Sequence, residues 1–126
     1  MIRFAQFQEC VFVKSRSESY LRVVYMGNIR TRGCKACCKR WYFTFNNAEC
    51  KDPAPIDGAL YQGIDINIHR VTNIEGYCGG IAAGKVKVGF SIGNCGCGAS
   101  SSSADGFTSW NQVTRIIIEE VEPPVA

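Results

Sequence analysis

Cysteine is the residue that most restricts how this chain can fold, because eight of its 126 residues are cysteines. Cytosolic glutathione would keep so many thiols reduced, so this composition is typical of a secreted domain held together by disulfides. The even number allows four bridges, and the sequence alone leaves about 105 pairings open. We expect all eight to be oxidised: Cys10, Cys34, Cys37, Cys38, Cys50, Cys78, Cys95 and Cys97.

The spacing of the cysteines also allows a zinc site to be considered. Cys34 and Cys37 form a CxxC pair, but a structural zinc site needs a second such pair or a histidine pair at a set distance. The other cysteines are spaced irregularly, and no βαβ pattern surrounds the pair as it would in a thioredoxin-like site. Cys37 and Cys38 are adjacent and would point to opposite faces of an extended chain, so they are expected to bond different partners. Disulfides are therefore favoured, and no metal is expected.

Length and charge indicate a single globular domain over residues 1–126. A chain of 13.9 kDa is long enough for one core and too short for two ordinary domains. No apolar run approaches the roughly 20 residues that a helix needs to cross a bilayer, so membrane insertion is not expected. A net charge of +3 with scattered basic residues does not predict nucleic-acid binding. The N-terminus lacks the apolar core of a signal peptide, so we expect an excised domain with Met1 supplied by the expression vector.

Apolar side chains alternate with polar ones along most of the chain, which predicts strands with one buried face. No stretch shows the 3.6-residue period of an amphipathic helix. About ten short strands separated by turns predict an all-β sandwich, jelly roll or closed barrel. The clearest segments are residues 4–7, 10–14, 20–25, 29–32, 41–45, 58–62, 64–69, 85–92 and 115–121. Residues 93–108 break this rhythm and are expected to form a surface loop.

The last predicted strand suggests an interface. Ile116 and Ile118 can face a core, which places Ile117 on the opposite face with Arg115 and Glu119. A single exposed Ile is tolerated on folded surfaces. Alternatively, the outer face of this strand packs on another subunit. The pattern alone leaves both interpretations open.

The chain offers few residues to an enzyme. Ser91 lies in a G-x-S-x-G pattern, but inside a predicted strand rather than at a strand–helix turn. His69 is the only histidine and shares a polar face with Asp65 and Asn67, so we expect it to be solvated. We therefore expect no enzymatic activity, no catalytic residue and no cofactor.

Five basic residues form a second candidate site. Such a cluster can bind sulfated glycans or an acidic protein, although a solvated face balanced by nearby acids is the simpler interpretation. The five are Arg30, Arg32, Lys35, Lys39 and Arg40.

Four ordered segments together carry a family resemblance. The most specific is CKACCKRWYFTFNNAEC at residues 34–50. The others are INIHR at 66–70, EGYCGGIAAG at 75–84 and WNQVTRIIIEE at 110–120. With these segments, the chain resembles the C-terminal domain of the collagen triple helix repeat-containing protein family over most of its length. It departs from the family pattern around residues 57–64, in the Ser-rich loop expected at residues 93–108, and at Cys97, which looks additional.

The resemblance implies a globular C-terminal head that follows a collagen-like region outside this chain and forms homotrimers. It also implies a jelly-roll sandwich similar to the complement component 1q and tumour-necrosis-factor heads. The implied role is extracellular, in Wnt and Frizzled signalling and in collagen matrix deposition, with no catalytic residues. A head that trimerises first would align three collagen chains, whose register is otherwise costly to nucleate. The outer face around Ile117 is then the expected interface.

Overall fold

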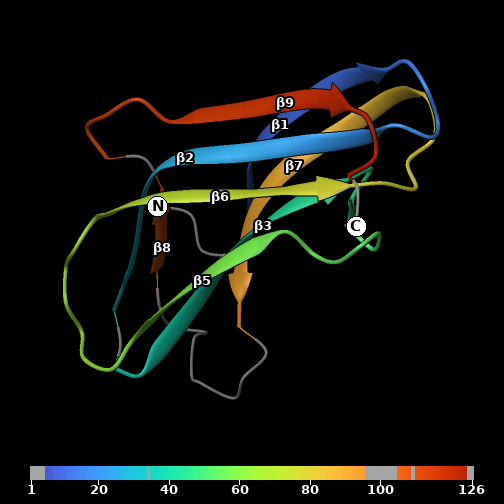
Figure 1. Cartoon of the computed structure of the whole chain (residues 1–126). Helices are drawn as coiled ribbons and strands as arrows, with labels where there is room; N and C mark the ends of the chain where they lie inside the picture. Colours follow the sequence, from blue (N-terminus) through green and yellow to red (C-terminus); the bar gives the residue numbers. More distant parts are fainter. Residues whose placement is uncertain (1–4, 34, 96–104, 109, 125–126) are drawn as a thin grey trace.

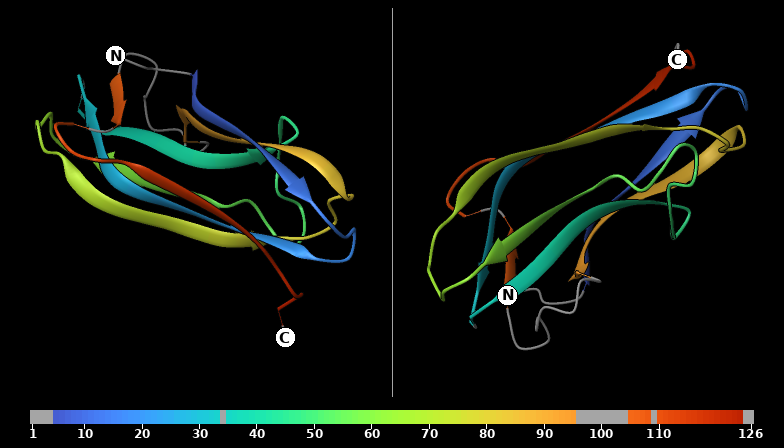
Figure 2. Two further views of the ribbon diagram at one scale, coloured as in Figure 1. Left: turned by 90° about the horizontal axis from the view of Figure 1, so that it is seen from above. Right: turned by 60° about the horizontal axis from the view of Figure 1, so that its bottom comes forward.

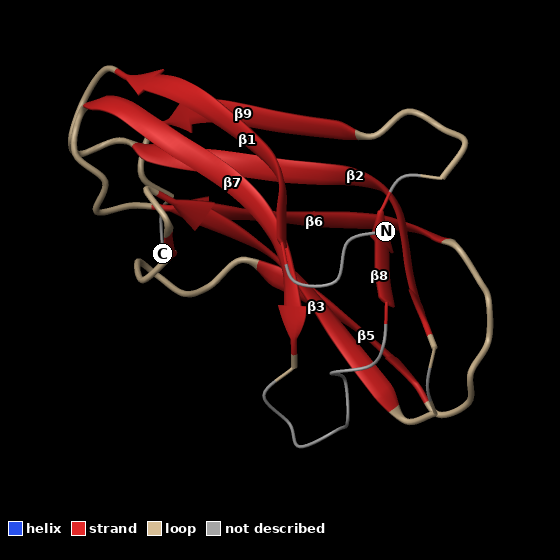
Figure 3. Cartoon of the chain, turned by 180° about the vertical axis from the view of Figure 1, so that it is seen from behind, coloured by secondary structure: helices blue, strands red, loops and turns tan. Residues whose placement is uncertain are grey.

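The computed structural model describes residues 5–33, 35–95, 105–108 and 110–124 (Figure 1). Within these residues the chain forms nine β-strands and no helix, which confirms the all-β fold class. The strands form two antiparallel sheets that lie one over the other, as Figure 2 shows. Seen from behind in Figure 3, β1 and β7 of one sheet lie in front of β2 and β6 of the other.

The two sheets differ in organisation. In the five-stranded sheet, β7 lies between β1 and β3, and β3 also pairs with β4 and β5. Its strands are β1 (Ala5–Lys14), β3 (Cys37–Phe45), β4 (Ala48–Glu49), β5 (Asp57–Gln62) and β7 (Gly84–Asn94). The four-stranded sheet is built around β2, which is the longest of the nine strands. Its strands are β2 (Tyr20–Arg32), β6 (Arg70–Cys78), β8 (Asp105–Thr108) and β9 (Arg115–Val121).

Strand β2 pairs with a single strand along one edge and with two strands, one after the other, along its other edge. On one side it pairs with β6 along most of its length. On the other side its first half, from Tyr20 to Met26, pairs with β9, and its last residues, from Ile29 to Arg32, pair with β8. Because these partners hold β2 throughout, the two segments predicted at 20–25 and 29–32 are one continuous strand. Likewise the segments predicted at 4–7 and 10–14 are both part of β1.

Alternating side chains of the central strands fill the space between the sheets. Tyr25 of β2, Trp41 and Phe43 of β3, and Phe90 of β7 are each 0% exposed. The Tyr25 ring stacks on Phe90 with 4.4 Å between the ring centroids, and Phe43 lies 4.7 Å from Phe90. These contacts join the two sheets. The predicted burial of Trp41, Phe43 and Phe45 on one face of a strand is confirmed.

Disulfides hold the strands at both ends of β3. The bridges between described residues are Cys38–Cys95 and Cys50–Cys78. The first lies within the five-stranded sheet, and the second connects that sheet to β6 of the other sheet. Cys37 is also disulfide-bonded, and Cys38 and Cys95 are not its partners because they bond each other. The expectation that Cys37 and Cys38 bond different partners is therefore confirmed.

Cys10 corrects the expectation that all eight cysteines are oxidised. It lies within β1 opposite Val88 of β7, and its thiol is free. A disulfide needs two Cα atoms within about 7 Å of each other. Every other cysteine that the structure describes is already bonded, so none can pair with Cys10. Cys34 and Cys97 lie outside the described residues.

The strand predicted at residues 64–69 is wrong. Residues 63–69 form a loop, the Ile64 side chain is 63% exposed, and β6 begins only at Arg70. The physical reason is topological: β5 ends at Gln62 in one sheet and β6 lies in the other, so the intervening residues must cross between sheets. Alternating Ile residues at 64, 66 and 68 cannot pair with a strand along that path.

The surface loop predicted at residues 93–108 is also corrected at both ends. Strand β7 continues to Asn94, and β8 occupies residues 105–108, where it pairs with the end of β2. Residues 96–104, in the middle of this stretch, lie outside the described residues.

Glu120 of β9 fixes the turn between β1 and β2. Its Oε1 accepts hydrogen bonds from the Ser15 backbone N–H at 2.8 Å and the Ser15 hydroxyl at 2.9 Å. Its Oε2 accepts one from the Arg16 backbone N–H at 3.0 Å and another from the Ser19 hydroxyl. These bonds, that of Ser19 most of all, lower the pKa of Glu120 to about 2. The carboxylate therefore connects the edge strand β9 to the 15–19 turn.

Replacing Glu120 by Gln should lower the melting temperature at neutral pH. It should also make the melting temperature fall less as the pH is lowered. The folded-state pKa of about 2 lies below the ordinary value of 4.5. The carboxylate's contribution to stability is therefore present above about pH 4.5 and is lost as the pH falls toward 2. The amide N–H groups of Gln would also point toward the backbone N–H and hydroxyl groups that donate hydrogen bonds to Glu120. Thermal unfolding followed by circular dichroism from pH 2 to 7 measures both effects.

Glu122→Gln is the matched control, because the exposed Glu122 carboxylate contacts only the Arg16 side chain among the described residues. It should leave the acid profile close to that of the unmodified chain. A Glu120→Gln variant whose melting temperature falls as steeply below pH 4.5 as that of the unmodified chain would contradict the assignment.

Candidate functional site

The outer face of the four-stranded sheet contains the residues that the sequence pointed to as an interface. Ile116 and Ile118 of β9 pack against the core, which confirms their predicted direction. Arg115, Ile117 and Glu119 therefore lie on the opposite face of the strand. Ile117 is 39% exposed and is the register partner of Val24 on β2. The three candidate interface residues thus share one outward surface.

Charged groups on this outer face neutralise one another. Arg22 of β2 lies between the two neighbouring strands, and its Nη1 donates to Glu119 Oε1 of β9 at 2.5 Å. Its Nη2 donates to Glu75 Oε2 of β6 at 3.0 Å. Hydrogen bonds to Glu119 and then to Glu75 raise the pKa of Arg22. The charges of Arg22, Glu75 and Glu119 are therefore paired within one sheet.

Apolar and aromatic side chains lie beside these charged groups. Val24 at its centre is only 3% exposed, although no second layer covers it in the described structure. Ile117 of β9 pairs with Val24 and is 39% exposed, and Tyr77 of β6 pairs with the neighbouring Arg22 and is 43% exposed. We call Val24, Ile117 and Tyr77, with the ion-paired Arg22, the outer strip. A surface of paired charges around apolar groups can be covered by another protein without leaving an unpaired charge.

The five basic residues predicted as a patch do not share one surface. Strand β3 places Lys39 and Arg40 on opposite faces, because side chains alternate along a strand. Lys39 is 0% exposed and its Nζ donates to Asn94 Oδ1 at 2.7 Å. Arg40 lies on the other face of the sheet and pairs with Glu49 and Asp57. Both residues are therefore unavailable to an external anion, and the predicted patch is wrong for them.

Arg40 is held tightly on its own surface. Its Nε donates to Asp57 Oδ2 at 2.7 Å, and its two Nη groups donate to the Glu49 carboxylate. The guanidinium also lies over the Tyr42 ring, with Cζ 4.5 Å from the ring centroid. Hydrogen bonds to Glu49, more than those to Asp57, raise its pKa. Arg40 thus joins β3 to β4 and β5.

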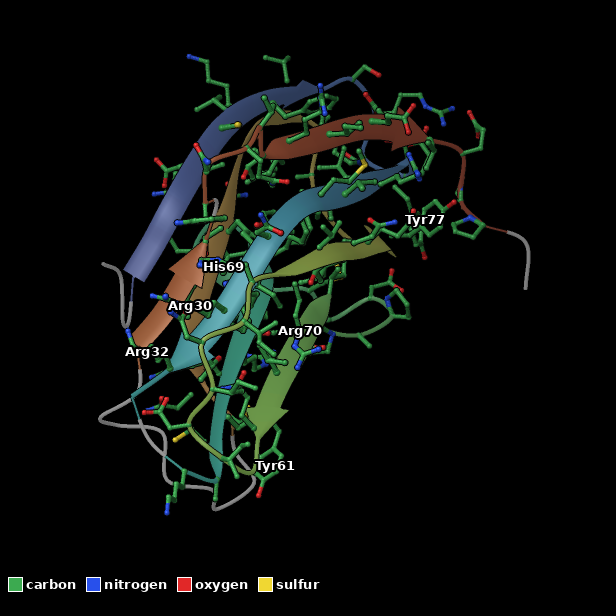
Figure 4. All side chains as sticks on the ribbon, turned by 90° about the vertical axis from the view of Figure 1, so that its left-hand side faces the viewer. Arg30, Arg32, Tyr61, His69, Arg70 and Tyr77 are labelled. Atoms are coloured by element: carbon green, nitrogen blue, oxygen red, sulfur yellow. A yellow bond between two sulfur atoms is a disulfide. The ribbon has the colours of Figure 1, made fainter. Side chains whose placement is uncertain are left out.

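The remaining basic residues lie near the end of β2. Arg30 is 8% exposed, whereas Arg32 and Lys35 are exposed. Arg30 Nη1 donates to Asn67 Oδ1 at 2.7 Å, so the 63–69 loop lies against this end of the strand. Figure 4 shows Arg32, Arg30 and His69 following one another at this end, whereas Arg70 lies apart from them across β2.

His69 is part of an aromatic pair rather than a solvated surface residue, which corrects the expectation from sequence. Its ring stacks on Trp110, with 4.7 Å between the centroids and 20° between the planes. Burial and the nearby charge of Arg30 both lower the pKa of His69. Asn28 Nδ2 donates to the Trp110 carbonyl at 3.4 Å, and the Trp110 side chain is 53% exposed. Two loops therefore meet across the outer side of β2.

Sequence reasoning missed this pairing because its two halves are far apart in the chain. The segments at 66–70 and 110–120 both marked the family resemblance, but no local pattern shows that His69 and Trp110 meet. Strand β2 brings them together, because β6 begins on one side of it and β8 ends on the other.

Comparison with known proteins then places the chain. It matches the family model described as CTHRC1, C-terminal domain, over residues 2–118. The chain belongs to this family. The resemblance that the four sequence segments indicated is thereby confirmed. No solved structure matches the chain. Family membership and the disulfides together identify a disulfide-bonded β domain of a collagen-related secreted protein family.

The described part of this CTHRC1-type domain contains no group of three residues that could hold a metal ion. It also contains no helix long and apolar enough to cross a membrane. Ser91 is 7% exposed within β7, as its sequence context predicted. A hollow of about 590 Å³ lies between β3 and the 51–55 loop, and its carboxylate, Glu49, is already paired with Arg40.

Proposed function

We propose that this chain is a non-enzymatic head domain that assembles into a homotrimer through the outer strip of its four-stranded sheet. The observation that carries the proposal is Ile117, exposed at 39% beside the nearly buried Val24. Arg22 is paired on both sides, so a second copy can cover this surface without isolating a charge. Partner and self-association surfaces are commonly apolar at the centre and polar at the rim.

The assembly gives the domain a role in a collagen-related protein. Three collagen chains must be aligned in register before their triple helix forms, and a head that trimerises supplies that alignment. We propose that the sandwich is a jelly roll of the kind found in complement component 1q and tumour-necrosis-factor heads. The all-β, two-sheet architecture and the family membership support this proposal.

The trimer would act by contact with extracellular partners. We propose a Wnt or a Frizzled-type receptor as the partner and collagen matrix deposition as the wider setting, on the support of family membership. Three equal sites on one assembly raise apparent affinity for a receptor-coated surface by roughly 10² to 10⁴ without any new contact.

The proposal predicts that Ile117→Asp dissociates the assembly. The unmodified domain should scatter light as a particle of about three times the 13.9 kDa chain mass at micromolar concentration. The variant should scatter as a monomer, because the introduced carboxylate would be buried without a partner. Surface plasmon resonance should then show a large loss of binding to immobilised Frizzled-type ectodomain. Binding of soluble monomeric ectodomain to immobilised variant should change little.

Val13→Asp is the matched control, since Val13 is 68% exposed on the outer side of the five-stranded sheet. It should remain trimeric. A monomeric unmodified domain would refute the trimer, and a trimeric Ile117→Asp variant would refute the outer strip as its interface. If no ectodomain binds the intact trimer at micromolar concentration, the signalling role is wrong for this chain.

A further inference from the structure

Strand β1 forms an edge of the five-stranded sheet, and its central residues are all apolar. Among the described strands it pairs with β7 alone, so its other side presents backbone N–H and C=O groups along the blue ribbon of Figure 4. The stretch from Cys10 to Val13 reads Cys-Val-Phe-Val, without a charged residue. Val11 and Val13 point away from the core and are 63% and 68% exposed. This edge therefore has the properties of a surface on which another strand is added to a sheet.

The other described edge strands carry features that hinder such addition. Charged side chains and short length both discourage an edge from pairing with a further strand. Strand β9 contains Arg115 and Glu119, and β6 contains Arg70 and Glu75. Strand β5 begins with Asp57, and β4 and β8 have only two and four residues. Among these edges, β1 is therefore the one best suited to pairing.

The inward side chains of the same stretch are incompletely covered. Cys10 and Phe12 point between the sheets, because they are the register partners of the core residues Val88 and Val86. Both are nevertheless only half-buried, whereas Val86 and Val88 are 0% and 2% exposed. A strand placed beside β1 would cover these side chains, and removing their apolar area from water favours association.

Charged groups of opposite sign lie at the two ends of the exposed valines. Glu9 precedes Val11 on the outward face of β1, where its Oε2 is 3.6 Å from Lys87 Nζ. At the other end, the exposed Lys85 of β7 is the register partner of Val13. The outward surface thus runs from a carboxylate through two valines to an ammonium group. Such a surface is complementary to a second copy of itself turned through 180°.

We propose that the edge of β1 pairs with β1 of a second copy of this chain, antiparallel and about a two-fold axis at Val11. In this register Val11 lies opposite Val11 of the partner subunit, and Cys10 lies opposite Phe12 of the partner subunit. Glu9 lies opposite Val13 of the partner subunit and one strand away from Lys85 of the partner subunit. Strands are about 4.8 Å apart, so the Glu and Lys side chains meet across the valine.

This pairing is distinct from trimer assembly, because β1 and the outer strip belong to different sheets. It would join two trimers through their edges and so connect neighbouring collagen-related molecules. The pairing covers residues 8–14, and an edge of this length buries less area than the roughly 1,200 Å² of a stable interface. We therefore expect a dissociation constant of roughly 0.1–1 mM. The domain remains a trimer at micromolar concentration and doubles in mass when it is concentrated.

The test uses two variants that should fail alone and recover together. Glu9→Lys places two ammonium groups against each other across the interface, and Lys85→Glu places two carboxylates there. In sedimentation from about 10 µM to about 2 mM, each variant alone should associate about tenfold more weakly than the unmodified domain. In an equimolar mixture every mixed pair regains two contacts between opposite charges, so association should return to within about twofold of the unmodified domain. A partner other than a second copy would not give this recovery.

Val11→Lys should abolish the association, because it places two like charges at the two-fold axis. Its matched control is Tyr61→Lys, since Tyr61 is 58% exposed on β5, at the opposite edge of the same sheet. This control should associate like the unmodified domain. Light scattering at about 10 µM should give the same mass for all these variants, which separates this edge from assembly at Ile117. A domain that is monomeric at that concentration would refute the trimer and would still form dimers through β1.

Three results would overturn the proposal. The first is an unmodified domain whose mass stays constant up to about 2 mM, as expected if the edge binds an extended peptide of another protein instead. The second is a mixture of the two charge variants that associates no better than either variant alone. The third is a loss of association in Tyr61→Lys as large as that in Val11→Lys.

Discussion

Replacing Trp41 by Ala should lower the free energy of unfolding by about 3–5 kcal/mol, the largest loss that we expect from one side chain. Trp41 is 0% exposed at the centre of β3 and is the largest fully buried side chain among the described residues. Its indole N–H donates to Thr108 Oγ1 at 3.1 Å, which joins the five-stranded sheet to β8 of the other sheet. The substitution therefore leaves a cavity and an unpaired hydroxyl. Denaturant unfolding followed by circular dichroism measures the loss.

Two further variants separate the contributions of Trp41. Trp41→Phe keeps most of the apolar volume and removes the indole donor, so it should cost about 1–2 kcal/mol. Trp110→Ala removes the same side chain from a half-exposed position and should cost about 1 kcal/mol or less. A loss below about 1 kcal/mol for Trp41→Ala would show that the space between the sheets is not packed around this residue.

The burial of Trp41 could be predicted from the sequence because it depends only on alternation along its own strand. Apolar alternation at residues 41–45, 85–92 and 115–121 predicted strands that the structure confirms, because each has one face on the core along its whole length. The separation of Glu119 from Glu120 was also predictable. Glu119 reaches Arg22 on the outer face, and Glu120 reaches the 15–19 turn.

The same local signal failed where a segment changes sheets or has a distant partner. Alternation at 64–69 is as regular as in the real strands, yet this segment crosses between the sheets. Strand β6 was not among the predicted segments. Gly76 is required there because a Cβ atom would lie only 2.9 Å from Ile56 Cγ1. Packing between sheets, which sequence periodicity does not encode, decided both cases.

The candidate sites show the same division. The direction of Ile117 could be predicted because it depends only on alternation within β9. The five basic residues could not be placed from the sequence. The buried hydrogen bond of Lys39 depends on Asn94, and the ion pairs of Arg40 depend on Glu49 and Asp57, all from other strands. Side-chain contacts across strands therefore determine which charges remain available to a partner.

The free thiol of Cys10 marks a further limit of sequence counting. An even number of cysteines makes complete pairing attractive, but pairing depends on which strands the fold brings together. Cys10 lies on β1, whose only strand partner in the described structure is β7, opposite Val88. Cysteine number thus predicted the compartment and the presence of bridges, and the topology determined which thiols could meet.

Removing the Cys50–Cys78 bridge should lower the free energy of unfolding by about 3–4 kcal/mol and the melting temperature by roughly 10–15 °C. The bridge closes a loop with a sequence separation of 28 and joins the end of β4 to the end of β6, in opposite sheets. Its loss lets the unfolded chain sample many more arrangements. The variant is Cys50→Ala/Cys78→Ala, which leaves no unpaired thiol at the site, and thermal and denaturant unfolding measure the change.

The local contacts around this bridge sharpen the prediction, because they remain when it is removed. The Gly79 backbone N–H donates to the Asp52 carbonyl at 2.7 Å, and the Tyr20 hydroxyl donates to the Asp52 carboxylate at 3.2 Å. The double variant should therefore keep its native circular dichroism spectrum at 25 °C while unfolding at lower denaturant concentration. Cys10→Ala, which removes a thiol that forms no bridge, should cost about 1 kcal/mol or less. If the double variant is no less stable than Cys10→Ala, these contacts alone hold the two sheets together and the bridge adds nothing to them.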